Sequence, residues 1–214
     1  MSALRIRVLA LLAALLPAAP AMGQPIAHDD GFVLVANETL DQSSYRRSVI
    51  LVVPAEGSRY VGVILNRPTQ RLLSDLFPDH APSRKITDPV YFGGPMSQQA
   101  IFAVVQRGAS PGPGSLRVLS DVYLALTAAG VDRIIEEAPQ NARFYVGAVI
   151  WMPGELRDEI ADNFWHVMDA HSELLFRKDT RGMWDELTRI ARAVTARTSP
   201  TPTRALLRMS PWGA

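Results

Sequence analysis

The chain has 214 residues, of which 48% are apolar and 20% are charged, and its formal net charge is +1. These proportions are typical of a soluble globular domain with one sizeable core. The absence of cysteine excludes disulfides, thiol catalysis, cysteine-ligated zinc and a lipid-modified N-terminal cysteine.

Residues 1–23 have the three regions of a secretory signal peptide. Two arginines precede an apolar run over 8–16, and small residues with an Ala-x-Ala pattern follow it. Pro17 interrupts the apolar run before it reaches the roughly 20 residues that a membrane span needs. We therefore expect a periplasmic or secreted protein with no transmembrane segment after cleavage of the signal. The alternative is a cytoplasmic protein whose translation starts at Met22.

The charge is unevenly distributed along the chain. Removal of residues 1–23 changes the net charge from +1 to −1, and residues 195–214 hold three arginines and no acid. The body between them, residues 24–194, is therefore near −4. An acidic body argues against nonspecific nucleic-acid binding, which needs a basic face. The Thr-, Pro- and Arg-rich composition of 195–214 predicts a disordered tail after a single domain.

The segment from 24 to 194 carries interspersed strand and helix signals. Apolar and β-branched runs predict strands at 32–36, 48–53, 60–65, 90–92, 101–106, 144–151 and 164–168. Helical spacing and capping residues predict helices at 72–77, 120–128, 132–138, 153–163, 173–176 and 183–194. Gly130 is expected to end the helix that follows Ser120. The pattern predicts an α+β domain with a mixed, largely antiparallel sheet and surrounding helices.

Two short polar motifs follow apolar strands and are the best candidate sites. Pro68 holds Arg67 extended after Asn66, which leaves the guanidinium to bind a carboxylate or phosphate, or to tie down a neighbouring loop. Gly93 and Gly94 either expose N–H groups to a ligand, admit another backbone closely, or form a tight turn with positive φ.

Arg46, Arg47 and Ser48 stand where the strand 48–53 begins. An arginine that is buried there must be paired, and Asp41 and Asp75 are the candidate partners.

Catalytic and metal-binding patterns are weak in this sequence. A nucleophilic Ser48 would need a histidine such as His166, and no Gly-x-Ser-x-Gly motif occurs. Glu155 and Glu159 lie one helical turn apart, which suits a divalent cation but also favours the helix dipole without one. The histidines form no zinc-binding pair, and no phosphate-binding Gly-rich loop is present. We assign no catalytic residue and expect no metal and no cofactor.

Taken together, these motifs resemble the YqgE/AlgH family. The matching stretches are 40–49, 62–68, 91–95 and 147–156, and the similarity extends from Gly31 to about Arg189. The resemblance implies one compact domain with a mixed β-sheet and surrounding helices. Members of that family are described as uncharacterised proteins or proposed transcriptional regulators, so no catalytic residue is transferred. The chain departs from the family pattern at Met152, at Glu155 and in its N-terminal signal, which is unusual for a family that resembles cytoplasmic proteins.

The favoured hypothesis is a non-catalytic binding or regulatory domain that recognises an unknown protein or a small anionic ligand. Its binding surface is predicted to consist of Asn66, Arg67, Gly93, Gly94, Arg47 and Ser48. Two alternatives remain open, namely a cytoplasmic transcriptional regulator if translation starts at Met22, and a hydrolase or transferase that the motifs do not reveal. Export would argue against a nucleic-acid partner.

Overall fold

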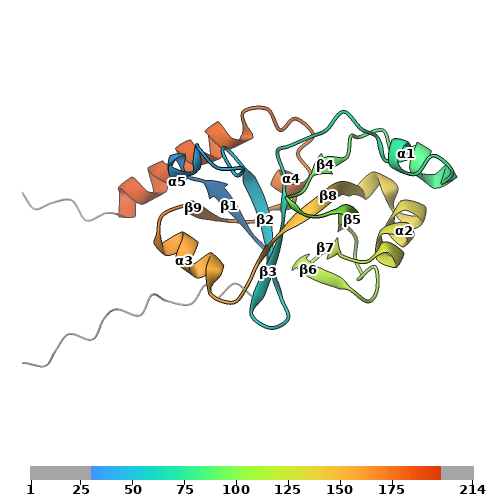
Figure 1. Ribbon diagram of the computed structural model, residues 1–214, viewed down its shortest axis with the longest axis horizontal. Coiled ribbons are helices and arrows are strands. Elements are labelled where there is room, and N and C mark those ends of the chain that lie inside the picture. Colours follow the sequence, from blue (N-terminus) through green and yellow to red (C-terminus); the bar gives the residue numbers. More distant parts are fainter. Residues whose placement is uncertain (1–29, 199–214) are drawn as a thin grey trace, which may run out of the picture.

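A nine-stranded sheet organises the protein, whose computed structural model describes residues 30–198 (Figure 1). The strands are β1 (Phe32–Ala36), β2 (Val49–Ala55), β3 (Arg59–Ile64), β4 (Tyr91–Phe92), β5 (Met96–Gln106), β6 (Ser115–Leu119), β7 (Val122–Ala125), β8 (Ala142–Trp151) and β9 (Trp165–Asp169). They lie in the order β6-β7-β5-β8-β3-β2-β1-β9, with β4 beside β8 off this path. The β4–β8 pair is parallel and the other pairs are antiparallel. The predicted α+β domain with a mixed, largely antiparallel sheet is confirmed.

Helices lie towards both ends of the sheet (Figure 1). They are α1 (Leu73–Leu76), α2 (Ala128–Glu137), α3 (Glu155–Ala161), α4 (Ser172–Leu175) and α5 (Met183–Thr198), with 3-10 turns at Glu38–Leu40, Ala81–Lys85 and Pro139–Asn141. Trp165 of β9 bonds to Glu159 of α3, whereas its neighbour His166 is within electrostatic reach of Arg192 on α5. Because successive strand residues point to opposite faces, α3 and α5 cover opposite faces of β9.

The core is built on strands that are apolar on both faces. All five residues of β1 are fully buried, and so are Val49 to Val52 of β2. Uninterrupted apolar runs of this kind are typical of strands covered on both sides. The predicted hairpin of β2 and β3 is present, with Leu51 opposite Val63.

The helix predicted at 120–128 is wrong. Residues 122–125 form β7, which pairs with β5 on one side and β6 on the other. Pairing on both sides satisfies the backbone of this short apolar segment and overrides its local helical spacing. The helix begins at Ala128 instead, where Thr127 Oγ1 accepts a hydrogen bond from Gly130 N at 3.2 Å. Gly130 therefore lies in the first turn of α2 and does not end a helix.

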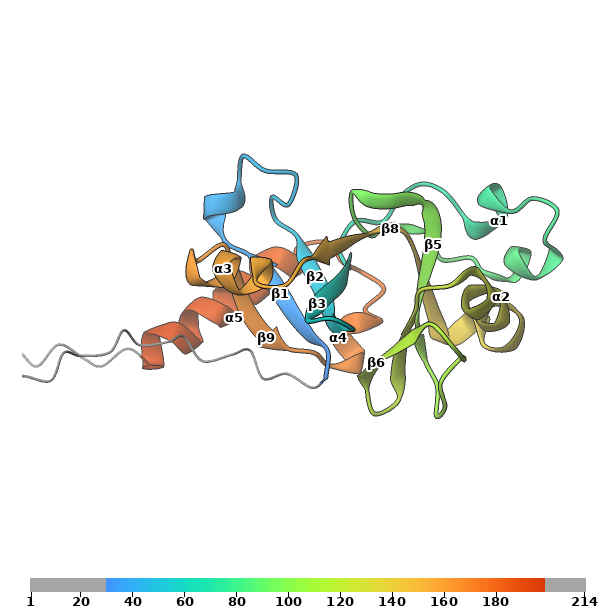
Figure 2. The same cartoon turned by 60° about the horizontal axis from the view of Figure 1, so that its bottom comes forward.

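The sheet curls strongly, as the turned view shows (Figure 2). The curl brings β6 back towards the start of β1, where Gly31 N donates to Val118 O at 2.7 Å. A side chain on Gly31 would collide with Val118, so glycine is required at this close approach.

The predicted signal, residues 1–23, and residues 199–214 of the predicted tail lie outside the described residues. Helix α5 continues to Thr198 rather than ending at 194. Within residues 30–198, no helix has both the length and the apolar character needed to cross a bilayer.

Candidate functional site

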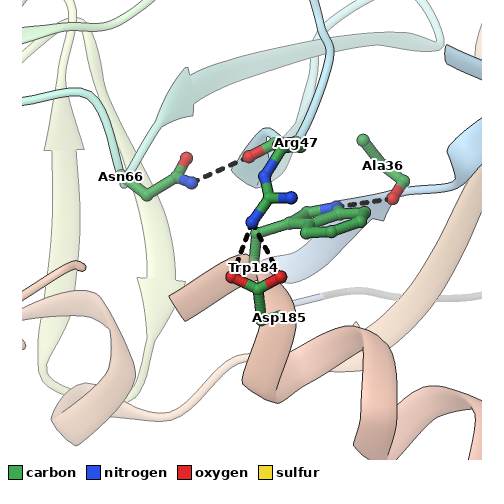
Figure 3. A network of polar contacts seen from close by, with 5 residues as sticks. All are labelled: Ala36, Arg47, Asn66, Trp184 and Asp185. Atoms are coloured by element: carbon green, nitrogen blue, oxygen red, sulfur yellow. Dashed lines mark hydrogen bonds and ion pairs between the residues drawn. The ribbon is translucent and has the colours of Figure 1, made fainter. Parts of the chain in front are cut away.

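The end of β3 holds the loop that leads into β2. Asn66 Oδ1 accepts a hydrogen bond from Val49 N at 2.9 Å, and Asn66 Nδ2 donates to Arg47 O at 2.9 Å. One amide side chain thus satisfies a backbone donor and a backbone acceptor on either side of Ser48. The bond between Asn66 and Arg47 is drawn in Figure 3.

Arg67 ties down the same loop. Its Nη2 donates to Ser44 O at 2.7 Å, to Arg46 O at 3.1 Å and to Ser48 Oγ at 2.8 Å. Burial lowers the pKa of the Arg67 guanidinium, and the charge of Arg46 acts in the same direction. The sequence left open whether Arg67 binds an anion or fixes a neighbouring loop. In the structure it fixes the loop, and it also lines the adjacent pocket.

Arg47 joins this loop to α5. It has a φ of 55°, in the left-handed region, and its Nη2 lies 2.6 Å from Asp185 Oδ2 (Figure 3). Its guanidinium lies 4.4 Å from the ring centroid of Trp184, whose Nε1 donates to Ala36 O at 2.7 Å. The partner suggested from the sequence, Asp41 or Asp75, is wrong for Arg47. The side chain is half exposed rather than buried, and Asp185 comes from a helix 138 residues further along the chain.

A polar pocket of about 640 Å³ opens between this loop and the start of α5. Its lining residues are Asp41, Gln42, Ser43, Ser44, Arg46, Arg47, Asn66, Arg67, Thr180, Arg181, Gly182, Met183, Trp184 and Asp185. Four of them are arginines and two are aspartates. Arg47 is paired with Asp185, and Arg181 is paired with Asp179 just outside the lining. The side chain of Arg46 has no hydrogen bond or ion pair with the described part of the chain.

Gly93 and Gly94 are not part of this pocket, although they are near it. Both are buried against β8, where a Cβ on Gly93 would overlap the carbonyl of Gly147 and one on Gly94 would overlap the backbone of Ala148. Neither has a positive φ. Close approach of another backbone, one of the readings left open by the sequence, therefore explains both glycines.

The structure thus brings together four of the six predicted site residues. Asn66, Arg67, Arg47 and Ser48 meet in one network, and Gly93 and Gly94 lie outside it, against β8. The sequence reasoning missed the part of the pocket that comes from 180–185. Trp184 lies in the helix predicted at 183–194, but no local signal indicates that its indole stacks on an arginine.

The residues considered for catalysis or metal binding do not come together in one site. Ser48 is fully buried and its Oγ accepts a hydrogen bond from Arg67, while His166 lies on β9 with a buried Nε2 that has no hydrogen-bond partner among residues 30–198. Glu159 Oε2 accepts the indole N–H groups of Trp151 and Trp165 at 2.9 and 2.7 Å. Over residues 30–198 no group of three His, Asp or Glu side chains is arranged to hold a metal ion.

Comparison with known proteins identifies the family. The profile of DUF179, described as AlgH-like, matches residues 33–213. The chain belongs to the AlgH-like family. This AlgH-like protein is 26% identical over 169 residues to a UPF0301 protein of Parabacteroides distasonis, which covers 75% of this chain and 84% of the relative. A UPF0301 protein of Mycobacterium tuberculosis is 28% identical over 162 residues, covering 74% and 80%.

Two solved structures share the fold of this AlgH-like protein. Protein DIP2367 of Corynebacterium diphtheriae aligns with a TM-score of 0.62 at 23% identity, covering 82% of this chain and 89% of that chain. The solution structure of AlgH from Pseudomonas aeruginosa aligns with a TM-score of 0.62 at 20% identity, covering 83% and 97%. At these identities the likeness establishes the fold alone.

Proposed function

We propose that this protein is a non-catalytic binding domain that takes an anionic group, a carboxylate or phosphate of a small ligand or of a partner protein, in the pocket beside α5. The observation that carries the proposal is Arg46. Arg46 and Arg67 line the same pocket, the positive charge of Arg46 adds to burial in lowering the pKa of Arg67, and the Arg46 guanidinium has no carboxylate partner in the described chain. Two like charges held close together favour an anion between them.

The surrounding contacts support a pre-formed site. The loop that carries Arg46 is fixed from behind by Asn66 and Arg67, so little ordering is needed when a ligand binds. The start of α5 also lines the pocket and adds the positive end of a helix dipole. The negative charge of Asp185 offsets this positive end only in part, because Asp185 is itself paired with Arg47. Arg67 then acts mainly by positioning the loop, and Arg46 is the residue that meets the ligand.

The test uses inorganic phosphate and citrate as probes, followed by NMR of the mature protein. We expect shifts of the amides of 43–48 and 182–185, and loss of these shifts in Arg46→Gln. Arg71→Gln is the matched control, because Arg71 is exposed, has no side-chain partner in the described chain and lies outside the pocket. Equal binding by Arg46→Gln and the wild type, or no shifts with either probe, would refute the site.

We also propose that the protein acts outside the cytoplasm, as the signal-like residues 1–23 suggest. The mass of the native N-terminus in fractionated cells tests this directly. A periplasmic species that starts near Met22 or Gln24 supports export. A cytoplasmic species would instead favour the regulatory alternative, and salt-dependent DNA binding by the domain would then be the next measurement.

A further inference from the structure

The two edges of the sheet are built differently. The β6 edge has structural features that hinder the addition of another strand. Its register shifts between Arg117 and Leu119, and Arg117 forms an ion pair with Asp30 at 3.2 Å. The chain before β1 also covers part of it, since Gly31 N donates to Val118 O. This edge is closed.

The β9 edge has none of these protective features. Its five residues pair with β1 in unbroken register, from Trp165 opposite Ala36 to Asp169 opposite Phe32. The strand contains no proline, lysine, arginine or bulge, and its one carboxylate, Asp169, is the last residue. No other strand of the described chain pairs with its outer side (Figure 1). An edge of this kind is a ready template for strand addition.

The hydrogen-bond pattern indicates which backbone groups are available. Asn37 N donates to Phe164 O at 2.8 Å, which makes these two residues a hydrogen-bonded pair in the β1–β9 ladder. Since such pairs alternate in antiparallel strands, His166 and Met168 direct their backbone groups towards β1. Trp165, Val167 and Asp169 therefore direct their N–H and C=O groups outwards.

Several of the exposed side chains around this edge are apolar. A groove of about 780 Å³ runs along β9 between the end of α3 and the side of α5. Val167, Ile190 and Val194 are 38%, 42% and 55% exposed along it. Of the charged residues that line the groove, Arg177 and Glu186 form an ion pair at 2.7 Å, whereas Asp169 and Glu173 form no ion pair within residues 30–198. Apolar side chains beside an open strand edge favour burial against another protein chain.

We infer that two copies of this chain pair through β9, antiparallel, about a two-fold axis at Val167. In that register Val167 lies opposite its own copy, Trp165 lies opposite Asp169, and His166 lies opposite Met168. Val167 is the centre of the strand and has outward backbone groups, so it forms a hydrogen-bonded pair with itself, as a closed two-fold interface requires.

The charge pattern fits a second copy as the occupant. Asp169 meets Trp165 and never its own copy, so no like charges face each other across the strands. The two-fold keeps each sheet face continuous, which places both α5 helices on the same side and covers Ile190 of each copy. The assembly is then one sheet that continues from β9 of one copy into β9 of the other.

Sedimentation of the mature protein tests the assembly. We expect a mass twice that of one chain for the wild type and a single-chain mass for Val167→Lys and for Ile190→Lys. Leu72→Lys is the control, because Leu72 is 37% exposed and directly precedes α1, which lies at the opposite end of the molecule from β9 (Figure 1). Circular dichroism of each variant confirms that the domain is folded. A monomeric wild type, or a dimer that withstands both groove variants, would overturn the inference.

Cross-linking distinguishes this register from other dimers. Because the chain has no native cysteine, Val167→Cys introduces a single thiol. Two copies paired at residue 167 bring their Cα atoms to about 5.5 Å, within reach of a disulfide. We expect oxidation to give a covalent dimer with Val167→Cys and none with Leu72→Cys. A dimer in solution without this cross-link would refute the β9 register and place the interface elsewhere.

Discussion

The ends of β3 and β4 lie side by side but are held by different kinds of contact. Phe92 N donates to Arg67 O, and Ile64 N donates to Gly93 O, each at 2.9 Å. After β3, the Asn66 and Arg67 side chains reach across to a loop. After β4, Gly93 and Gly94 let two backbones touch. Side-chain contacts tolerate partial replacement, whereas a backbone contact does not, and this difference can be tested by substitution.

The largest effect is expected at the glycine contact. Gly94→Ala places a methyl group against the backbone of Ala148, which cannot move without disrupting β8. We expect the free energy of unfolding to fall by about 3 kcal/mol or more, measured by chemical denaturation. Gly108→Ala is the control, since nothing lies within 4 Å of that position, and it should change stability by less than about 1 kcal/mol. Similar values for the two variants would contradict the role of the close approach.

Arg67→Ala is expected to have the next largest effect. It removes the donor shared by Ser44 O, Arg46 O and the buried Ser48 Oγ. We expect a loss of about 1–3 kcal/mol and faster amide hydrogen exchange over the loop residues 43–48. Arg71→Ala provides the comparison for loss of an exposed arginine. Unchanged exchange in the loop would show that Arg67 does not hold it.

Asn66→Asp distinguishes the contributions of the two hydrogen bonds that the Asn66 side chain makes. The carboxylate can still accept from Val49 N, but it cannot donate to Arg47 O. We expect a loss of about 1 kcal/mol, and a larger loss for Asn66→Ala, which removes both bonds. The order wild type, Asn66→Asp, Asn66→Ala in denaturation midpoints is the result to check. Equal midpoints for the two variants would mean that the bond to Val49 contributes nothing.

The smallest effect is expected at Arg47, where backbone strain and side-chain contacts oppose each other. Arg47→Ala removes an exposed ion pair and a stacking contact, for a loss of about 1 kcal/mol. Arg47→Gly loses the same contacts but relieves the positive φ, which costs other residues roughly 1 kcal/mol. Thermal unfolding should therefore show Arg47→Gly at least as stable as Arg47→Ala. A clearly less stable glycine variant would exclude strain at this position.

Much of the fold could be predicted from local pattern. The runs at 32–36 and 144–151 became β1 and most of β8, and the apolar spacing of 183–194 became most of α5. The sequence pattern of residues 122–125 wrongly predicts a helix, because a four-residue strand has too few positions to establish its period. Its identity depends on pairing with β5 and β6, which lie elsewhere in the chain.

The candidate site, like the fold, combines features that local pattern predicts with contacts that it does not predict. Local pattern was enough to predict that Asn66, Arg67, Gly93 and Gly94 follow two strands, and that Arg47 and Ser48 lie next to the start of another. The hydrogen bonds from Arg67 to backbone carbonyls, the contact of the glycines with β8, and the pairing of Asp185 with Arg47 depend on the folded arrangement of the whole domain. Local propensity acts over a few residues, whereas these contacts join segments far apart in the chain and exist only after the sheet has formed.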